Sequence, residues 1–255
     1  RFGQLWLGHG RQGWNRGRQG RQRVAGPGVA GQPAVRRRQR HDRIGGGGPL
    51  RQRLGRQFGL GRRLDLLDPS PLDIEISDIA HGLARVARWN GQTNGDHAFS
   101  VAQHSLVVDD IVTRMNEGCS PDLRLAALLH DAPEYVIGDM ISPFKKVLGG
   151  NYKAVEARLE AAVHIRFGLP PHPTKAVKAK IKRADQVSAF FEATLLAGFS
   201  EKEAVTYFGR PRGVSPDGLD MTPRPAGEVQ DAYLARFAEV AAAFQAAQTP
   251  GRKRA

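Results

Sequence analysis

The sequence predicts an all-α protein in which several helices form one compact domain of about 185 residues, after an Arg/Gly-rich N-terminal segment. Apolar residues recur at helical spacing through most of the chain beyond Leu64, and capping residues and prolines separate these stretches. No alternating apolar and polar run of convincing length argues for a strand, and the sequence has no internal repeat. The 255 residues are enough for one or two domains with a sizeable core.

Residues 1–64 differ in composition from the rest of the chain. They contain sixteen Arg and one acidic residue, Asp42, so their charge is +15; because the whole chain carries +13, the other 191 residues sum to −2. Glycine is abundant, with four in a row at 45–48, and large apolar side chains are few. Such a composition cannot offset the entropy lost on ordering, so we expect this segment to be disordered.

Three interpretations of this segment remain open. It is a nucleic-acid-binding tail, an extension or linker without a function, or the product of a misplaced start site, since the chain lacks an initiator Met and its composition changes near Leu64. Arg-rich RNA-binding arms usually interleave aromatic residues with Arg. The aromatic residues of the segment are few, which favours the second and third interpretations; they are Phe2, Trp6, Trp14 and Phe58.

The first helix of the domain is expected to begin near Ile76, after an extended stretch that contains two prolines. Ser77 or Asp78 serves as its N-cap in this interpretation. Its apolar stripe consists of Ile79, Leu83 and Val86. Residues 90–99 carry Asn-Gly twice and are therefore expected to form a loop.

Caps and prolines also delimit the later helices. A second helix is expected from about Ser100 to Glu117. A third follows the Ser120-Pro121-Asp122 cap, which places Pro in the first turn, and runs to about His130. Residues 138–146 are expected to form a loop. Further helices are expected at 151–166, 174–197, 200–207 and 226–247, with three prolines between the first two, and a basic tail at 249–255 follows the domain, which spans 65–248.

Cysteine content and hydropathy suggest the compartment. Cys119 is the single cysteine, which excludes a disulfide framework and favours a reducing environment. No run approaches the roughly 18 apolar residues that span a bilayer. The N-terminus has no apolar core of a secretory signal, and a transit peptide should be rich in Ser, of which residues 1–64 have none. We therefore expect a cytoplasmic protein without a membrane partner.

Polar groups that are costly to bury gather at the end of the third predicted helix. Residues 125–129 have the apolar character of a buried face, and His130 and Asp131 follow them directly. Imidazole and carboxylate are standard ligands of divalent metals, and two of each suit a transition metal that keeps open positions for water. The remaining ligands would have to come from other helices.

Two residues on other predicted helices fit this requirement. His104 lies near the start of the second helix, and Asp185 lies among apolar neighbours in the helix at 174–197. Taken separately, His104 has the alternative role of a capping or core histidine, and Asp185 that of a salt-bridge partner of Lys182. Together with His130-Asp131 they form the pattern H…HD…D, with spacings of 26 and 54 residues.

This pattern on a helical background resembles the HD superfamily of metal-dependent phosphohydrolases. Within the superfamily, the chain is most similar to bacterial HD-domain 5′-deoxynucleotidases. The resemblance covers residues 76–197 and, more weakly, the helix after 226, whereas residues 1–64 match nothing in that family. It is carried by RW at 88–89, SVAQHS at 100–105, HDAPEYVIGD at 130–139, SPFK at 142–145 and KRAD at 182–185.

The resemblance implies a compact multi-helix HD-domain bundle that removes phosphate from nucleoside 5′-monophosphates, deoxynucleotides above all, through a metal-bound water. It implies one divalent ion, either Mn, Co, Fe, Mg or Zn, and a small-molecule nucleotide as the partner. Members of the family often form dimers, so a homodimer is a further expectation. The residues that match the family's metal ligands are His104, His130, Asp131 and Asp185. Those that match its catalytic groups are Asp131 and Glu134. Those that match its substrate contacts are Arg88, Trp89 and Asp139.

Some residues around this pattern keep two interpretations. Arg88 is the better candidate for a phosphate clamp, and Arg85, three residues earlier, is then a solvated charge. Lys145 either faces the phosphate or belongs to a solvated pair with its neighbour. Glu134 either orients the attacking water or caps the next turn. His97 has no counterpart in the family and either supports the site or is an exposed loop histidine. His81, His164 and His172 have no such constellation and are interpreted as structural.

Three rival functions follow from the same residues. A phosphodiesterase or nucleoside-triphosphate hydrolase would share the fold, but two-metal diesterases carry further His ligands that have no match here. A nucleic-acid-binding protein would act through residues 1–64, with the helical domain as a scaffold; the domain itself is nearly balanced in charge, so nucleic acid is not its expected partner. A ligand sensor without turnover is disfavoured by the intact ligand set and Glu134.

Overall fold

The computed structural model describes residues 55–58, 62–140 and 150–249, all of which lie in the compact unit Arg53–Ala255. The predictions for residues 1–54, for Lys145 and most of the 138–146 loop, and for the tail beyond Thr249 lie outside the described residues. Helices predominate in the described ranges, which confirms the predicted all-α class. They are α1 (Ile76–Leu83), α2 (Val101–Met115), α3 (Pro121–Leu128), α4 (Glu134–Ile137), α6 (Gly150–Arg166), α7 (Lys175–Leu195), α8 (Glu201–Phe208) and α9 (Ala226–Gln248).

Side-chain caps begin several of these helices where the sequence placed them. Ser100 accepts a hydrogen bond from the backbone N–H of Gln103 at 3.3 Å, and α2 begins one residue later. Thr174 caps α7 in the same way, and Ser200 forms a capping box with Glu203 at the start of α8. Because caps act within one turn, these boundaries were predictable from short stretches of sequence.

The predicted cap of α1 was wrong. The N-cap is Glu75, whose backbone is extended, with φ −124° and ψ 138°, and whose side chain makes no capping hydrogen bond. Ser77 and Asp78 therefore lie inside the first turn of the helix. Val86 lies beyond the end of α1 at Leu83, so the buried apolar stripe of this helix is shorter than predicted.

Five short elements were not predicted. Strands β1 (Gly55–Phe58) and β2 (Arg62–Asp65) form an antiparallel hairpin with Gly55 opposite Asp65. The 3-10 turns η1 (Pro71–Asp73) and η2 (Arg88–Gly91) precede and follow α1, and α4 is a single turn of helix after Pro133. Each element is four residues or fewer, which is too short for periodicity to reveal.

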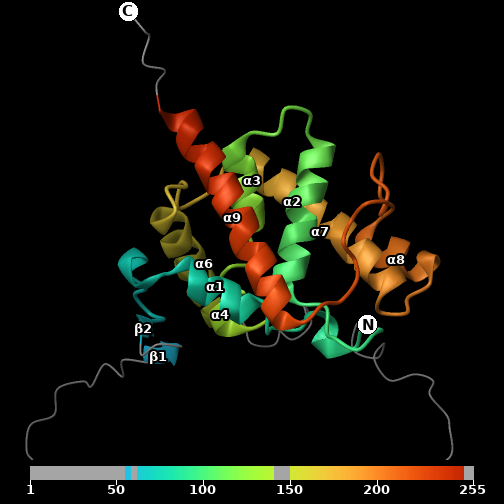
Figure 1. Ribbon diagram of the computed structural model, residues 1–255, viewed down its shortest axis with the longest axis horizontal. Coiled ribbons are helices and arrows are strands. Elements are labelled where there is room, and N and C mark those ends of the chain that lie inside the picture. Colours follow the sequence, from blue (N-terminus) through green and yellow to red (C-terminus); the bar gives the residue numbers. More distant parts are fainter. Residues whose placement is uncertain (1–54, 59–61, 141–149, 250–255) are drawn as a thin grey trace, which may run out of the picture. The chain divides into compact units, whose positions relative to one another are not determined.

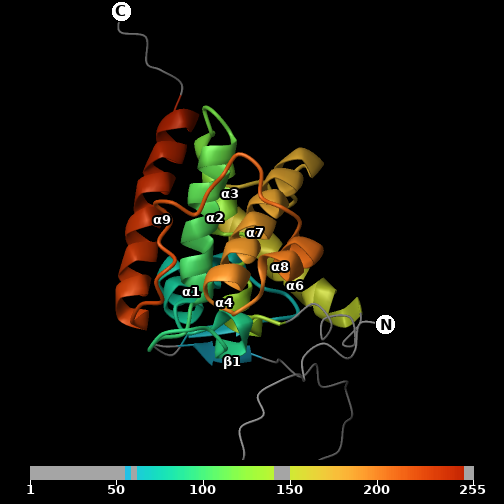
Figure 2. The ribbon, with the colours of Figure 1, turned by 90° about the vertical axis from the view of Figure 1, so that its right-hand side faces the viewer.

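Helix α2 lies at the centre of the helical packing and contacts α3, α7 and α9. Figures 1 and 2 show α9 running alongside α2, with α7 on another side of α2 and α8 packed against α7. The contact between α3 and α9 includes a buried hydrogen bond from the Tyr233 hydroxyl to the carbonyl of Leu128, at 3.0 Å. The end of α3, where the candidate ligands begin, is thereby held in the core.

A buried ion cluster fastens three of these helices together. Asp109 on α2 has no exposed surface and accepts two hydrogen bonds from Arg124 of α3, at 3.0 and 2.8 Å. Arg236 of α9 adds a third, at 2.7 Å. An unpaired buried carboxylate is costly, so these ion pairs join α2, α3 and α9.

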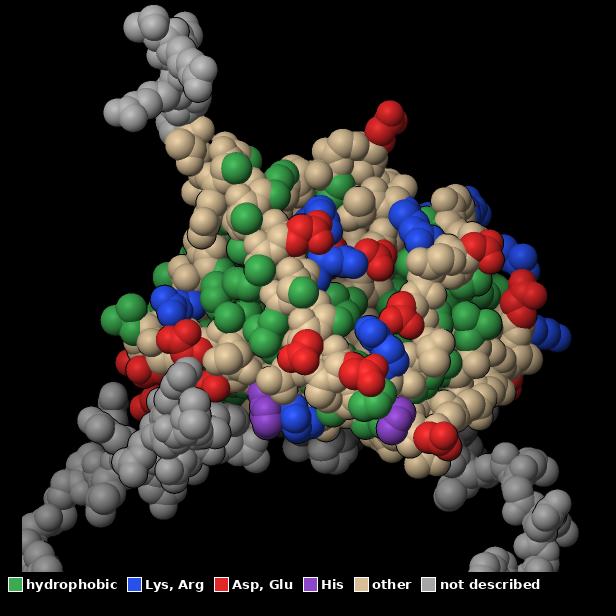
Figure 3. All heavy atoms as spheres, in the orientation of Figure 1, with side chains coloured by type: hydrophobic (Ala, Val, Ile, Leu, Met, Phe, Trp, Pro, Cys, Tyr) green, Lys and Arg blue, Asp and Glu red, His purple; other side chains and the backbone are tan. Residues whose placement is uncertain are grey.

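Charges of both signs are mixed on the face of the described unit that Figure 3 shows, with Lys and Arg side chains between Asp and Glu side chains. Every helix in the described ranges is too short or too polar to cross a membrane.

Candidate metal centre

Three helices bring together the side chains that the sequence singled out. His104 projects from α2, His130 follows α3, and Asp185 projects from α7. One ligand atom of each lies within 4.8 Å of the others, and the two Nε2 atoms of the histidines are 3.3 Å apart. Oδ2 of Asp131 lies 3.5 Å from Nε2 of His104 and 3.2 Å from Nε2 of His130. These four residues are called the HD cluster below.

The hydrogen bonds behind the two imidazoles decide which nitrogen of each ring faces the HD cluster. Nδ1 of His104 lies 2.5 Å from a carboxylate oxygen of Glu192, and Nδ1 of His130 lies 2.8 Å from the carbonyl oxygen of Ala127. Both partners can only accept, so both Nδ1 atoms carry hydrogen. Neutral rings would then point two Nε2 lone pairs at each other and at the Asp131 carboxylate. Such a donor set requires a proton or a cation at its centre, and it fits a divalent metal.

The pKa values of His104 and Asp131 reflect this convergence. Burial and the nearby Arg88 lower the pKa of His104, but the charge of Glu192 and hydrogen bonds to Glu192 and Asp185 outweigh them and raise it to about 10. Burial raises the pKa of Asp131, but the neighbouring His130 and His104 outweigh that effect and hold it below its usual range. These two pKa shifts favour a negative Asp131 carboxylate beside a protonated His104 imidazole.

Asp185 makes the contacts that each of its two interpretations requires. It is part of the HD cluster, with Oδ1 3.5 Å from Nε2 of His104, and its Oδ2 also accepts from Lys182 at 2.8 Å. The Lys182 side chain is largely exposed, so the ion pair with Asp185 contributes little by itself.

The structure also brings together the three predicted substrate contacts, Arg88, Trp89 and Asp139. They gather near Glu192, a residue that the sequence analysis missed. Arg88 donates to Asp139 at 3.1 Å and to Glu192 at 3.1 Å, and the indole N–H of Trp89 donates to Glu192 at 2.8 Å. Arg88 is thus a cation fixed between two carboxylates. Arg85, the alternative, instead donates to the carbonyl of His81 and to Gln230.

The remaining candidates take separate positions. Glu134 is buried and begins α4, where its backbone N–H donates to the carbonyl of Asp131 at 2.9 Å. The alternative of a surface glutamate is wrong, because this side chain is buried. His97 is exposed in its loop. Burial raises the pKa of the Cys119 thiol, so this cysteine is not an activated nucleophile.

Glu192 is the principal residue that the sequence analysis overlooked. It lies seven residues after Asp185 on α7, two helical turns further along the same face, with Ser188 between them. Its side chain has no exposed surface, and Ser188 donates to it at 2.8 Å. Glu within the apolar run FFEATLL was the available signal, because an acid there must be buried with a partner or disrupt the helix face.

A cavity of about 400 Å³ adjoins the HD cluster. Its lining includes three cluster residues together with two lysines and one buried histidine, namely His130, Asp131, Asp185, Lys178, Lys182 and His164. His164 was interpreted as structural; its Nδ1 is 3.0 Å from the carbonyl oxygen of Pro170, and burial lowers its pKa, so it lines the cavity as a neutral ring.

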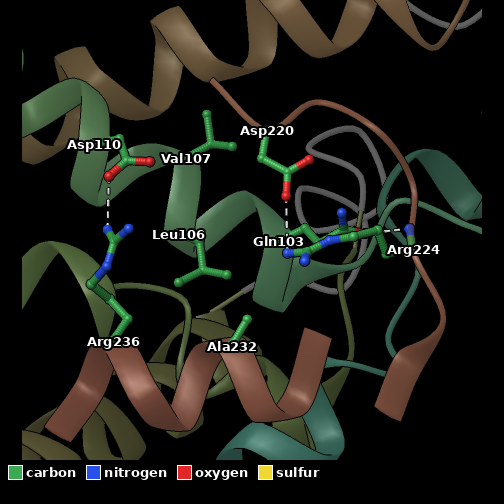
Figure 4. A pocket seen from close by; sticks show the side chains of 8 residues that line it. All are labelled: Gln103, Leu106, Val107, Asp110, Asp220, Arg224, Ala232 and Arg236. Atoms are coloured by element: carbon green, nitrogen blue, oxygen red, sulfur yellow. Dashed lines mark hydrogen bonds and ion pairs between the residues drawn. The ribbon is translucent and has the colours of Figure 1, made fainter. Parts of the chain in front are cut away.

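A second, smaller cavity of about 130 Å³ lies at α2, α9 and the segment that precedes α9 (Figure 4). Its charged residues are paired with each other, Arg236 with Asp110 and Arg224 with Asp220. None of the residues predicted for the site lines this cavity, so we place the functional centre at the HD cluster.

No protein-family model matches the chain. The chain is 59% identical over 176 residues to the uncharacterized protein RCAP_rcc00048 of Rhodobacter capsulatus, an alignment that covers 69% of this chain and 90% of that protein. It is also 34% identical over 106 residues to the uncharacterized protein YfdR of Escherichia coli, covering 42% of this chain and 54% of YfdR. The chain therefore belongs to the same family as RCAP_rcc00048.

Proposed function

We propose that this protein is a metal-dependent phosphohydrolase that releases phosphate from nucleoside 5′-monophosphates, with deoxynucleotides as its preferred substrates. The observation that carries the proposal is the convergence of two imidazole Nε2 atoms, 3.3 Å apart, on the carboxylates of Asp131 and Asp185. The substrate class comes from the resemblance of this pattern to the HD-domain 5′-deoxynucleotidases.

The residues of the HD cluster would hold one divalent ion, either Mn, Co, Fe, Mg or Zn. Such an ion lowers the pKa of a bound water and neutralises charge on the phosphoryl oxygens. The two carboxylates balance the charge of the ion, so the centre would be neutral overall and would still attract a phosphate dianion. Among the described residues, His104, His130 and Asp185 are the one group of three side chains spaced to hold a metal ion, which favours a single-metal monoesterase over a two-metal diesterase.

Glu134 is the residue to which we assign the handling of the nucleophile. Its backbone is tied to Asp131 by a hydrogen bond, and its buried carboxylate begins α4 at the end of the segment that carries His130 and Asp131. We assign it the role of orienting the attacking water and holding its proton. We assign Asp131 a catalytic role in addition to its role as a metal ligand.

Two groups of residues support an anionic, nucleotide-sized substrate. Lys178 and Lys182 line the 400 Å³ cavity beside the HD cluster, and we assign them the attraction of the phosphate group. Arg88, Trp89 and Asp139 lie on the Nδ1 side of His104, linked to it through Glu192, and we assign them the contacts to the nucleoside.

The first test is phosphate release by the purified chain. The panel contains 5′-deoxynucleotides, 5′-ribonucleotides and 3′-nucleotides, each with added Mn²⁺, Co²⁺, Mg²⁺ or Zn²⁺. We expect metal-dependent release from the 5′-deoxynucleotides, loss of both metal binding and release in His130→Ala, and retained metal binding with release reduced about 100-fold or more in Glu134→Gln. His81→Ala, which changes an exposed histidine outside the HD cluster, is the matched control and should keep full activity.

Other outcomes would redirect the proposal. Metal-loaded protein that releases no phosphate from any member of the panel would refute the nucleotidase assignment and favour another phosphorylated substrate or a ligand sensor. Full turnover in Glu134→Gln would remove that residue from the mechanism while leaving the metal centre intact.

A further inference from the structure

Glu192 is a buried carboxylate whose two oxygens serve two different parts of the site. Oε1 accepts from Nδ1 of His104 at 2.5 Å and from the Ser188 hydroxyl at 2.8 Å. Oε2 accepts from Nε of Arg88 at 3.1 Å and from the indole N–H of Trp89 at 2.8 Å. The side chain has no exposed surface, so water does not compete with these four donors.

The Oε1 side acts on a ligand of the HD cluster. Because a carboxylate only accepts, it keeps hydrogen on Nδ1 of His104 and leaves the Nε2 lone pair free to face the cluster. It also sets the plane of the ring. A carboxylate behind a ligating imidazole in this way increases its basicity and its affinity for metal.

Oε2 accepts hydrogen bonds from a segment whose backbone dihedral angles are unfavourable. Trp89 has φ 56° and Asn90 has φ 53°, both in the left-handed region that side chains other than Gly rarely occupy. The Trp89 ring packs against Phe199 and Phe208, with ring centroids 5.5 and 5.9 Å away, and its N–H reaches Glu192. The segment 88–91 is therefore held in place by the same carboxylate that orients His104.

We propose that Glu192 is a positioning residue that couples the Arg88–Trp89 segment to the metal ligand His104, so that metal binding at the HD cluster changes the environment of Trp89. The inference rests on the proposed metal centre, and it adds a connection between the metal and the nucleoside contacts. Coupling follows because Glu192 has no spare oxygen: a shift in either pair of donors must alter the other pair. By linkage, a change at Trp89 must then also alter the affinity for metal.

Glu192→Gln separates the two functions of this side chain without changing its shape. The amide has one accepting oxygen, and its NH₂ group must face a pair of donors, either those at His104 or those at Arg88 and Trp89. In either orientation, the side chain loses its hydrogen bonds from one of these two pairs of donors. Trp89→Phe is a milder variant, because it removes one donor from Oε2 and leaves the buried charge paired with Arg88.

The experiment measures Mn²⁺ binding by the full-length chain. Replacing Trp6 and Trp14 by Phe leaves Trp89 as the single tryptophan, so that its emission can be followed while calorimetry gives the dissociation constant. We expect Mn²⁺ to change the Trp89 emission in this background. In Glu192→Gln we expect Mn²⁺ affinity to fall about 10- to 100-fold and the emission change to disappear. In Trp89→Phe we expect affinity, measured by calorimetry, to change at least about fivefold.

Asp109→Asn is the matched control, since Asp109 is another fully buried carboxylate held by Arg side chains, but in the cluster that joins α2, α3 and α9. It should lower the melting temperature and leave the Mn²⁺ affinity unchanged. The coupling would be refuted by unchanged Mn²⁺ affinity in both Glu192→Gln and Trp89→Phe, or by an unchanged Trp89 emission response in Glu192→Gln. Either result would leave the proposed metal centre intact. Absence of Mn²⁺ binding in the parent chain would instead overturn the metal centre, and with it the proposed function. If Glu192→Gln fails to fold, the Trp89→Phe result decides.

Discussion

At the scale of single residues, the HD cluster is an assembly of groups that repel one another unless something positive lies between them. The imidazoles of His104 and His130 face each other through Nε2, and two carboxylates approach from the sides. Burial and Arg88 lower the pKa of His104, but Glu192 and Asp185 outweigh them and raise it to about 10, so this position favours a proton when no metal is bound. Metal and proton therefore compete for the same position.

This competition predicts a pH dependence of stability for the metal-free protein. The pKa of His104 is about 10 in the folded state, above its ordinary value of 6.5, so protonated His104 stabilises the fold below about pH 6.5 and this contribution is lost as the pH rises to about 10. We expect the melting temperature of the metal-free chain to fall across this range. His104→Gln should have a lower melting temperature at pH 6.5 and a flatter profile. Parallel profiles for the two proteins, measured by thermal unfolding in the presence of a chelator, would contradict this assignment.

At the scale of elements, the short helix α4 owes its position to a close contact with α1. Gly82 of α1 lies against Tyr135, and a Cβ at that position would be 2.8 Å from the Cβ of Tyr135 and 3.1 Å from its carbonyl oxygen. The neighbouring Glu134 begins α4, so the packing of the two helices also positions a proposed catalytic residue. A residue larger than Gly would separate α1 from α4.

Gly82→Ala is therefore expected to destabilise the protein and to reduce turnover. Overpacking costs about 1–3 kcal/mol, and the higher helix propensity of Ala offsets at most about 1 kcal/mol of that. Gly227→Ala in α9 is the control, because a Cβ there meets nothing within 4 Å. Thermal unfolding and phosphate release of the two variants check the prediction. Equal melting temperatures for both variants would show that the α1–α4 contact has room for a methyl group.

At the scale of the whole molecule, every described residue, including the complete HD cluster, lies in the unit Arg53–Ala255. Most of the charge that could attract nucleic acid lies before this unit, since residues 1–52 carry +11 and residues 53–255 carry +2. Phosphate release and nucleic-acid binding, the two activities considered for this chain, are thus assigned to different segments, and a truncation can separate them.

Removal of residues 1–52 should leave the melting temperature and the phosphate release of the protein unchanged. If the full-length chain binds RNA or DNA with a steep salt dependence, that binding should vanish on truncation. Loss of phosphate release in the truncated protein, with folding retained, would assign the Arg-rich segment a part in the reaction. Circular dichroism and the nucleotide panel, applied to both lengths, make the comparison.

Much of the helical pattern was predictable because the interactions that delimit helices act over a few residues. Ser100, Thr174 and Ser200 cap helices that begin within one residue of the predicted positions. The paired strands β1 and β2 and the single turn of α4 escaped prediction, since short elements have no period of their own and depend on what packs against them. The cap of α1 failed for a similar reason: the extended backbone of Glu75 starts that helix without a side-chain signal.

The sequence by itself determined the helices and the side chains that can bind a metal, because caps, periodicity and residue chemistry are local properties. Only the tertiary structure decided which nitrogen atoms face one another and which carboxylate supports them. Glu192 receives hydrogen bonds from Arg88, Trp89 and His104, which precede it by 104, 103 and 88 residues. Hydrogen bonds between groups so far apart in the chain form only once packed helices bring their partners together and exclude water.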